Sequence, residues 1–576
     1  MSNFFTDNAD LVAELERLDL ERVVELREDG FAEASNYTWA PRDLADALES
    51  YRLILELVGD IAGEFVAPRA EDVDRAGSTL VDGEVCYAPG ISEALTRLRQ
   101  ADLMGITLPR RFGGLNFPVT ILAMVTEIVS RADASLMNVF GLQEIAETVN
   151  KFASEEIKQA HLPRFASGEV TGSMALTEAE AGSDLQNIQL KARQDDDGRW
   201  YLNGVKRFIT NGCGQIALVL ARSEEGTTDG RGLSLFLYER DEHMKIRRLE
   251  DKLGIHGSPT CELQFTDAPA LLIGERRRGL TTHVMSLMNG ARLAIAAQAQ
   301  GIAEAAYRAA YKYSGERIQF GGPIRDITAV TTLLADMKAS LETARALLYE
   351  TAVMVDLKEG LEHRLEKAVE TGLSTDEIKV LRAEVKKYTN RVGLFTPLVK
   401  ARCTEAANRI AYDSLQVHGG SGYMRDFAVE RYMRDARITT IYEGTTQLQV
   451  VAARRGILSG TLSERFDDYE SWDLSRTPEL LARVKRARER FEAAVAHIQA
   501  LDDSRFWDHH APRVMEMGTD LVCAYLLLRE AQTDVRKLLM AEYFVERMAP
   551  ALEAGATVIF ESRPEKLDSL QTLAAD

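Results

Sequence analysis

One carboxylate stands in the stretch of the chain best suited to proton transfer, residues 438–449. There Glu443 lies between Tyr442 and Gly444, after a β-branched apolar run and before a series of threonines and glutamines. A carboxylate at a chain bend beside an apolar cavity loses solvation, which raises its pKa, and a neighbouring glycine lets a ligand approach the backbone. The stretch therefore predicts a general base, against the alternative that Glu443 is a loop glutamate in water.

Three other segments have residue types suited to binding. Residues 174–184 combine hydroxyls, small residues and a Gly-Ser pair, so the segment can bind phosphate oxygens or a polar planar ring, or is a capped turn. Residues 416–423 place dense glycines after a helix, which indicates a close backbone approach or a plain helix C-cap. Residues 315–323 put Arg317 at a helix end, where it could pair with a phosphate or be an ordinary surface arginine.

Composition limits the classes of partner. A chain of 576 residues can hold several domains, and its net charge of −20 argues against nucleic acid or an anionic membrane surface as the main partner. Five cysteines without metal-ligand spacing fit a reducing compartment, and we expect no metal site. The first residues lack the features of a signal peptide, and no apolar run is long enough to span a bilayer, so we expect a cytoplasmic protein.

The elements that must position these residues follow from hydrophobic periodicity. Helical stripes give way near residue 171 to short β-branched and aromatic runs, and helical stripes return from about residue 279. Helices, then strands, then helices predict an α+β fold rather than a doubly wound parallel sheet. We predict an N-terminal extension (1–40), an N-terminal helical domain (41–170) and a central antiparallel β-domain (171–274). A C-terminal helical bundle (275–460) with a charged helical insertion (356–390) follows, and then a helical C-terminal extension (470–576).

Local turn and cap signals refine this prediction. The pairs Asp197-Gly198, Asn203-Gly204 and Asn211-Gly212 predict β-hairpins, because both members of each pair tolerate positive φ. Ser374 and Glu377 have the spacing of a capping box, and Thr477 before Pro478 predicts the start of a helix.

Taken together, the functional segments resemble one family, the acyl-CoA dehydrogenases. Asn187 and Phe208 depart from the family pattern, in which a small residue and often a tryptophan are usual. The resemblance covers about residues 45–460, and a helical extension after it also occurs in the longer members. Residues 175–184 match the family's first signature and residues 206–212 its flavin-contacting strand. Residues 416–426, with Arg431 and Asp435, match its second signature, and residues 441–445 match its catalytic segment.

The resemblance implies a bound FAD and a role for each matching residue. Thr177 would bind the pyrimidine end of the flavin, Thr210 would lie near N5 with Phe208 beside the ring, and Ser183 would reach the pyrophosphate. Arg317 and Phe320 would hold the adenylate portion of FAD bound to a neighbouring subunit, and Gln416 and Gly420 would contact the same cofactor. Thr445 and Gln447 would also contact FAD.

The resemblance also implies a reaction. Glu443 would remove the α-proton of an acyl-CoA thioester while a hydride leaves the β-carbon for flavin N5, giving a trans-2-enoyl thioester, and its N–H would help bind the thioester oxygen. Tyr442, Gly444 and Arg292 would adjoin the substrate. The segment 288–292, where one branch of the family carries its base, offers no carboxylate here. The expected partners are acyl-CoA, an electron-transfer flavoprotein and further copies of the chain, as a homodimer or homotetramer.

Three alternatives stay open on the sequence. An acyl-CoA oxidase differs only in passing electrons to oxygen. A non-catalytic nucleic-acid-binding relative conflicts with the charge of −20 and an intact Glu443. A helical scaffold without a cofactor is the third alternative. The acyl group, whether linear, branched, cyclic or dicarboxylic, is also left open.

Overall fold

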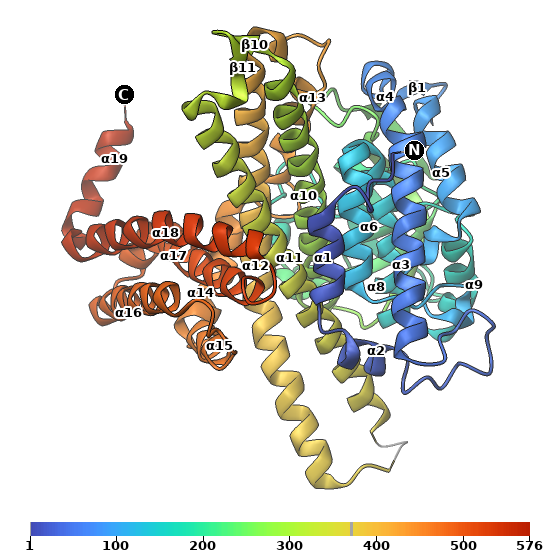
Figure 1. Cartoon of the computed structure of the whole chain (residues 1–576). Helices are drawn as coiled ribbons and strands as arrows, with labels where there is room; N and C mark the ends of the chain where they lie inside the picture. Colours follow the sequence, from blue (N-terminus) through green and yellow to red (C-terminus); the bar gives the residue numbers. More distant parts are fainter. Residues whose placement is uncertain (1, 369–371, 576) are drawn as a thin grey trace. The chain divides into compact units, whose positions relative to one another are not determined.

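Helices precede a β-sheet and further helices follow it in the computed structural model, which describes residues 2–368 and 372–575 (Figure 1). This order confirms the predicted α+β fold with an added helical block after the bundle. The chain divides into two compact units, of which the first comprises Met1–Tyr313 and Ser414–Thr439 and the second Ser314–Asp413 and Thr440–Asp576. In the part of the chain that the structure describes, no helix is both long enough and apolar enough to cross a membrane.

The first unit begins with helices that surround the almost wholly buried α6. Two bidentate ion pairs fasten the first forty residues to them: Arg131 with Asp7, at 2.5 and 2.7 Å, and the fully buried Arg110 with Glu28, at 2.7 and 2.9 Å. The elements here are α1 Ala9–Arg17, α2 Glu21–Arg27, α3 Leu44–Asp60, α4 Ala70–Ala76, the hairpin β1 Thr79–Val81 with β2 Glu84–Cys86, α5 Pro89–Gln100, α6 Val119–Ala132, α7 Ala134–Phe140, α8 Ile145–Phe152 and α9 Glu155–Ala166.

A seven-stranded sheet follows, in the order β3-β6-β4-β5-β9-β7, with β8 on β9 and a further pairing of β6 with β7. The prediction of a purely antiparallel unit is wrong for two pairs, because β3 and β4 each run parallel to β6. Neither is joined to β6 by a tight turn, and strands connected by longer crossings are free to run parallel. The strands are β3 Gly172–Ala175, β4 Lys191–Gln194, β5 Trp200–Thr210, β6 Ile216–Arg222, β7 Leu233–Glu239, β8 Met244–Leu249 and β9 Thr260–Ile273.

Only one of the three predicted hairpin turns joins two paired strands. Gly198 turns β4 into its partner β5 with φ +83°, as predicted. Gly204, in contrast, lies inside β5, where the register with β9 shifts, so this Asn-Gly pair marks a bulge. Asn211, at φ +51°, connects β5 to β6, but these two strands do not pair with each other.

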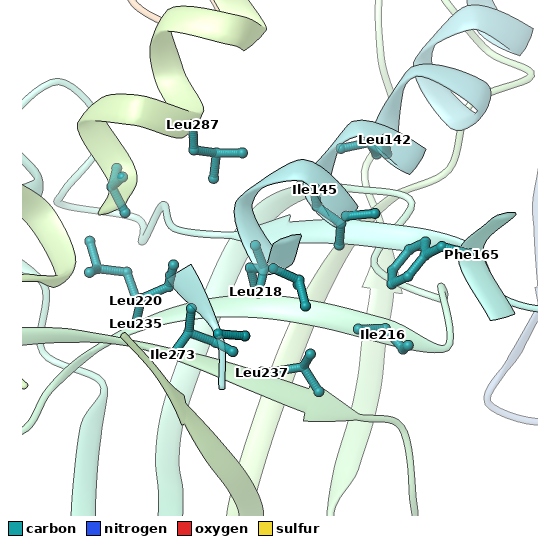
Figure 2. Close-up of a cluster of buried hydrophobic side chains, with 14 of the residues drawn as sticks. Leu142, Ile145, Phe165, Ile216, Leu218, Leu220, Leu235, Leu237, Ile273 and Leu287 are labelled. Carbon is teal, nitrogen blue, oxygen red and sulfur yellow. The ribbon is translucent and has the colours of Figure 1, made fainter. Parts of the chain in front are cut away.

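The sheet is buried on both faces. Alternate residues of β6 point to opposite sides, so Ile216, Leu218 and Leu220 lie on one face and the residues between them on the other. Figure 2 shows the first face, where these side chains and Leu235 and Leu237 meet the helical residues Leu142, Ile145, Phe165 and Leu287. Burial on both faces explains why β6 is a continuous apolar run in the sequence.

Helices make up most of the rest of both units. Two of them, α10 and α12, each pass from one unit into the other. The elements are η8 Gly279–Val284, α10 Met285–Glu316, the hairpin β10 Ile318–Gln319 with β11 Gly322–Pro323, α11 Thr328–Lys367, α12 Thr375–His418, η10 Gly419–Tyr423, α13 Val429–Thr439, α14 Thr446–Leu458, α15 Thr461–Glu470, α16 Pro478–Leu501, α17 Ser504–Glu530, α18 Val535–Glu561 and α19 Asp568–Ala574.

The predicted charged insertion comprises the C-terminal end of α11 and the N-terminal part of α12. Its residues 369–371 lie outside the described residues. The capping box is confirmed, since Ser374 N donates to Glu377 Oε2 at 2.8 Å and Glu377 N donates to Ser374 Oγ at 3.3 Å. Thr477 is the residue before α16, as predicted, but its hydroxyl donates to the Leu474 carbonyl and does not cap the helix.

Within the second unit, buried charges join the C-terminal helices to α11. Glu342 accepts from Lys537 of α18 at 2.7 Å and from Lys338 at 3.0 Å, and it also pairs with Arg345. Burial disfavours the Glu342 carboxylate, but Arg345 and Lys537 together hold its pKa well below its usual range. The C-terminal helices therefore share a compensated ionic core with α11 instead of forming a separate tail.

Candidate functional site

The loop after β3 lies along β5 and brings together the polar residues predicted to contact a flavin. Arg207 N donates to the Thr177 carbonyl at 3.0 Å, which sets the loop beside the strand that carries Phe208 and Thr210. Phe208 has φ +62° and leaves 49% of its surface exposed, an unusual state for an aromatic residue inside a strand. Residues held in strained backbone conformations cluster at ligand sites.

A buried ion pair fixes this loop. Lys206 Nζ, which is fully buried, donates to the Leu176 carbonyl at 2.8 Å and to Glu178 Oε1 at 2.9 Å. Burial lowers the pKa of Lys206 to about 8, although Glu178 opposes the shift. The Glu178 carboxylate also accepts from the backbone N–H groups of Gln189 and Leu190, at 2.7 and 2.9 Å. Both ends of the loop are thereby tied to one carboxylate, a role that the sequence did not reveal.

The chain bends at Glu443, as the sequence predicts. Glu443 has φ +54° and Gly444 has φ +92°, so two consecutive residues adopt the left-handed region. A Cβ at Gly444 would lie 2.7 Å from Gln449 Nε2, and side chains rarely adopt φ +92°, so glycine is the residue that fits this position without strain. Glu443 is half-buried, and a strained backbone at a partly buried carboxylate is typical of a functional site.

Two buried side chains hold the bend, and sequence reasoning assigned neither of them a role. The Gly444 carbonyl accepts from Lys400 Nζ at 2.7 Å and from Gln449 Nε2 at 2.9 Å. Gln449 lies in the stretch that the sequence singled out, whereas the signal for Lys400 was one lysine within an apolar part of a helix. Thr445 is the N-cap of α14, its Oγ1 accepting from Leu448 N at 3.4 Å.

A carboxylate of α13 organises the loop between β8 and β9 in the first unit. Asp435 Oδ1 accepts from Ile255 N at 2.5 Å, and Ile255 has φ +49°, a costly conformation for a β-branched residue. Arg434, next to it, makes a bidentate pair with Asp74 at 2.6 and 3.0 Å. Burial raises the pKa of Asp435 to about 7, against the opposing effects of the Ile255 N–H and Arg431.

We expect Asp435→Asn to change how stability depends on pH. Between pH 4 and 7 the folded protein keeps a proton on Asp435 that the unfolded chain has released, so the contribution of Asp435 to wild-type stability falls as pH rises through this window and levels off above it. The asparagine still accepts from Ile255 and does not titrate, so the variant gains stability relative to wild type, by up to about 4 kcal/mol. Urea unfolding at several pH values measures the difference, and parallel curves for the two proteins would contradict it.

The other predicted residues lie on separate elements of the two units. In the first unit, Gln416 and Gly420 are exposed at the end of α12 and in η10, and Arg292 of α10 donates to Asn289 at 3.0 Å. In the second unit, Arg317 and Phe320 belong to the exposed β10–β11 hairpin, where Phe320 has φ +51° and is 96% exposed. Gln447 is exposed on α14, four residues after Glu443.

Comparison with known proteins identifies the class of enzyme. Family models match nearly the whole described core: the N-terminal domain of acyl-CoA dehydrogenase over residues 49–169, its middle domain over 173–268, its C-terminal domain over 278–371 and 379–458, and a further acyl-CoA dehydrogenase C-terminal model over 458–551. The chain belongs to the acyl-CoA dehydrogenase family, as the sequence motifs predict. It is an FAD-dependent oxidoreductase whose substrate is an acyl-CoA.

Individual relatives support this assignment. The chain is 31% identical, over 82% of its length and 83% of the relative's, to 3-methylmercaptopropionyl-CoA dehydrogenase of Ruegeria pomeroyi. A chain in a structure described as an electron transferring flavoprotein of Acidaminococcus fermentans is 30% identical, with a TM-score of 0.61, over 71% of this chain and 97% of that one. An acyl-CoA dehydrogenase complexed with FAD from Bacillus anthracis shares the fold over 91% of both chains, with a TM-score of 0.74 and 23% identity.

Proposed function

We propose that the chain converts an acyl-CoA to the trans-2-enoyl-CoA, with Glu443 as the base that removes the α-proton. The observation that carries the proposal is the left-handed pair Glu443–Gly444, held by the buried Lys400 and Gln449. Because the hydrogen bonds of Lys400 and Gln449 fix the bend, the Glu443 carboxylate has a defined position. A general base needs such a position to remove a proton from carbon.

Polar groups without protein partners in the first unit support FAD as the bound cofactor. Among the described residues, none hydrogen-bonds to the side-chain hydroxyls of Thr177, Ser183 or Thr210, and the partly exposed Phe208 ring offers an apolar surface two residues before Thr210. In the second unit, the buried Oε1 of Gln449 has no hydrogen-bond partner among the described residues. The hydroxyls and the aromatic face of the first unit suit a polar, planar ring with a hydroxylated chain.

The proposed mechanism assigns each step to a residue of the chain. Glu443 takes the α-proton onto its carboxylate, and its own backbone N–H donates to the thioester oxygen, where charge develops. FAD, when bound, supplies the acceptor for the hydride that leaves the β-carbon. Tyr442, Gly444 and Arg292 are proposed to adjoin the thioester. Phe208 would pack against the cofactor but lacks the indole N–H that a tryptophan would offer.

The remaining cofactor residues are proposed to act from other segments. Thr445 and Gln447, just after the base, would also contact FAD. The others, which are exposed, would hold FAD of a neighbouring copy in a homodimer or homotetramer: Arg317, Phe320, Gln416 and Gly420. An aromatic residue exposed as fully as Phe320 on a fixed hairpin fits burial against a partner.

A flavin-bleaching experiment tests the proposal. Purified protein loaded with FAD and mixed without oxygen with linear, branched, cyclic and dicarboxylic acyl-CoAs should lose its flavin absorbance with at least one of them, and the enoyl-CoA should form. Bleaching by none of these classes would contradict the proposed reaction. Reoxidation by an electron-transfer flavoprotein, without release of peroxide, is the expected second step, and peroxide formed in each turnover would show an oxidase instead.

A further inference from the structure

The charge of the chain poses a problem for the proposed substrate. Coenzyme A carries a diphosphate and a phosphomonoester, and a protein with a net charge of −20 repels such an anion unless cations meet it locally. The longest uninterrupted basic run in the sequence is Arg276-Arg277-Arg278. It forms an exposed turn between the end of β9 and η8, in the first unit.

The three arginines are not equivalent. Arg276 donates to Glu224 Oε1 at 2.5 Å and lies over the Trp200 ring, so its charge is already compensated. Arg278 lies 3.7 Å from Glu275, a loose pair between two exposed side chains. Among the described residues, none forms an ion pair or hydrogen bond with the Arg277 guanidinium. The turn therefore presents one cation without a counter-charge and a second one that is weakly paired.

Backbone strain singles out Arg277. Its φ is +69°, a conformation that glycine adopts freely and that strains an arginine. The strain is held in place, because Arg277 N donates at 2.8 Å to Oγ of the fully buried Ser234, which in turn bonds Ser223 Oγ at 2.7 Å. A fixed turn with a strained and unpaired arginine is explained better by a ligand than by packing.

The turn adjoins the loop that carries Ser183. A Cβ at Gly230 would lie 3.0 Å from Leu280 and 3.7 Å from Gln186, and Gly230 N donates to Gln186 Oε1 at 3.4 Å. Gln186 is three residues after Ser183 and Leu280 is two residues after Arg278, so the segments next to the Ser183 loop and to the arginine turn meet at Gly230.

We propose that Arg277, assisted by Arg278, binds the phosphate groups at the nucleotide end of the acyl-CoA substrate. This inference rests on the proposed function for the identity of the ligand. A planar guanidinium donates two parallel N–H groups to phosphate oxygens, and the loose pair at Glu275 leaves Arg278 able to join it. Binding energy gained at this remote end positions the thioester without contact to the reacting carbons.

Calorimetric titration with CoA tests the proposal without turnover. Arg277→Gly removes the guanidinium and relieves the strain, so the Kd for CoA should rise about tenfold while Tm stays the same or increases. Arg278→Gln should give a smaller rise. Arg111→Gln, an exposed arginine in an ion pair with Glu155 among the N-terminal helices, makes the same charge change elsewhere and should leave the Kd unchanged. Flavin bleaching by an S-acyl pantetheine, which has no phosphates, should be equal in all four proteins.

Each outcome bears on a different claim. Equal CoA affinity in wild type and Arg277→Gly, or a Tm that falls together with affinity, would overturn the phosphate site. A wild-type protein that binds no CoA would overturn both the site and the proposed substrate. CoA binding that weakens in Arg277→Gly, in a protein that no acyl-CoA bleaches, would support the site and contradict only the proposed reaction.

Discussion

Glu443→Gln should leave a yellow, folded protein whose flavin an acyl-CoA no longer bleaches. Glutamine has the shape of glutamate, so the left-handed bend and its contacts to Lys400 and Gln449 through the Gly444 carbonyl are kept. It cannot take up the α-proton. Loss of a general base costs about 10²- to 10⁴-fold in rate, and more when no water can replace it.

Stopped-flow measurement of the bleaching rate without oxygen checks this expectation. A matched control is Glu405→Gln, since Glu405 is another carboxylate near the bend and accepts from Thr446 Oγ1 at 2.6 Å. That variant should bleach within a few-fold of wild type. The spectrum of bound FAD in Glu443→Gln shows whether the site is intact, and bleaching at the wild-type rate would move the base to another residue.

The arrangement of helices and strands could be predicted because period and texture change sharply along this sequence. The short apolar run of β6, which follows a turn pair, indicates a buried strand, and the stripes of period 3.6 before and after the sheet indicate helices, so element type follows from the pattern. The pairing of the strands could not be predicted in the same way. The parallel pairing of β3 with β6 depends on where the 176–190 loop goes, and no local signal records that path. Gly204 shows the same limit, because an Asn-Gly pair suits a bulge as well as a turn.

For the candidate site, sequence motifs pointed to the residues but not to what holds them. The bend at Glu443 could be anticipated from the adjoining glycine, whereas Lys400 reaches Gly444 from 44 positions earlier in the chain. In the same way, Glu178 and Lys206 each fell within a motif, yet their pairing became visible only in the structure. Long-range polar contacts of buried groups depend on the packing of several elements, and residue spacing alone does not specify them.

Lys206→Met should cost both stability and affinity for FAD. Methionine fills a similar volume but leaves the Leu176 carbonyl without its 2.8 Å hydrogen bond and removes the counter-charge of Glu178. Breaking a buried pair by removing one partner costs about 3–5 kcal/mol. The loop that is released carries Thr177 and Ser183, the proposed flavin contacts, so the Kd for FAD should rise about tenfold or more, as measured by fluorescence titration of the folded apoprotein.

A second buried pair of the same unit separates this role from a general loss of stability. Arg110→Met breaks the pair with Glu28 among the N-terminal helices and should lower the free energy of unfolding by a similar amount while the folded fraction binds FAD normally. If Lys206→Met behaves in the same way, the pair is structural only. The double variant Glu178→Gln/Lys206→Met should recover part of the stability, since no buried charge is then unpaired, but not the FAD affinity, because the Leu176 carbonyl still lacks its donor.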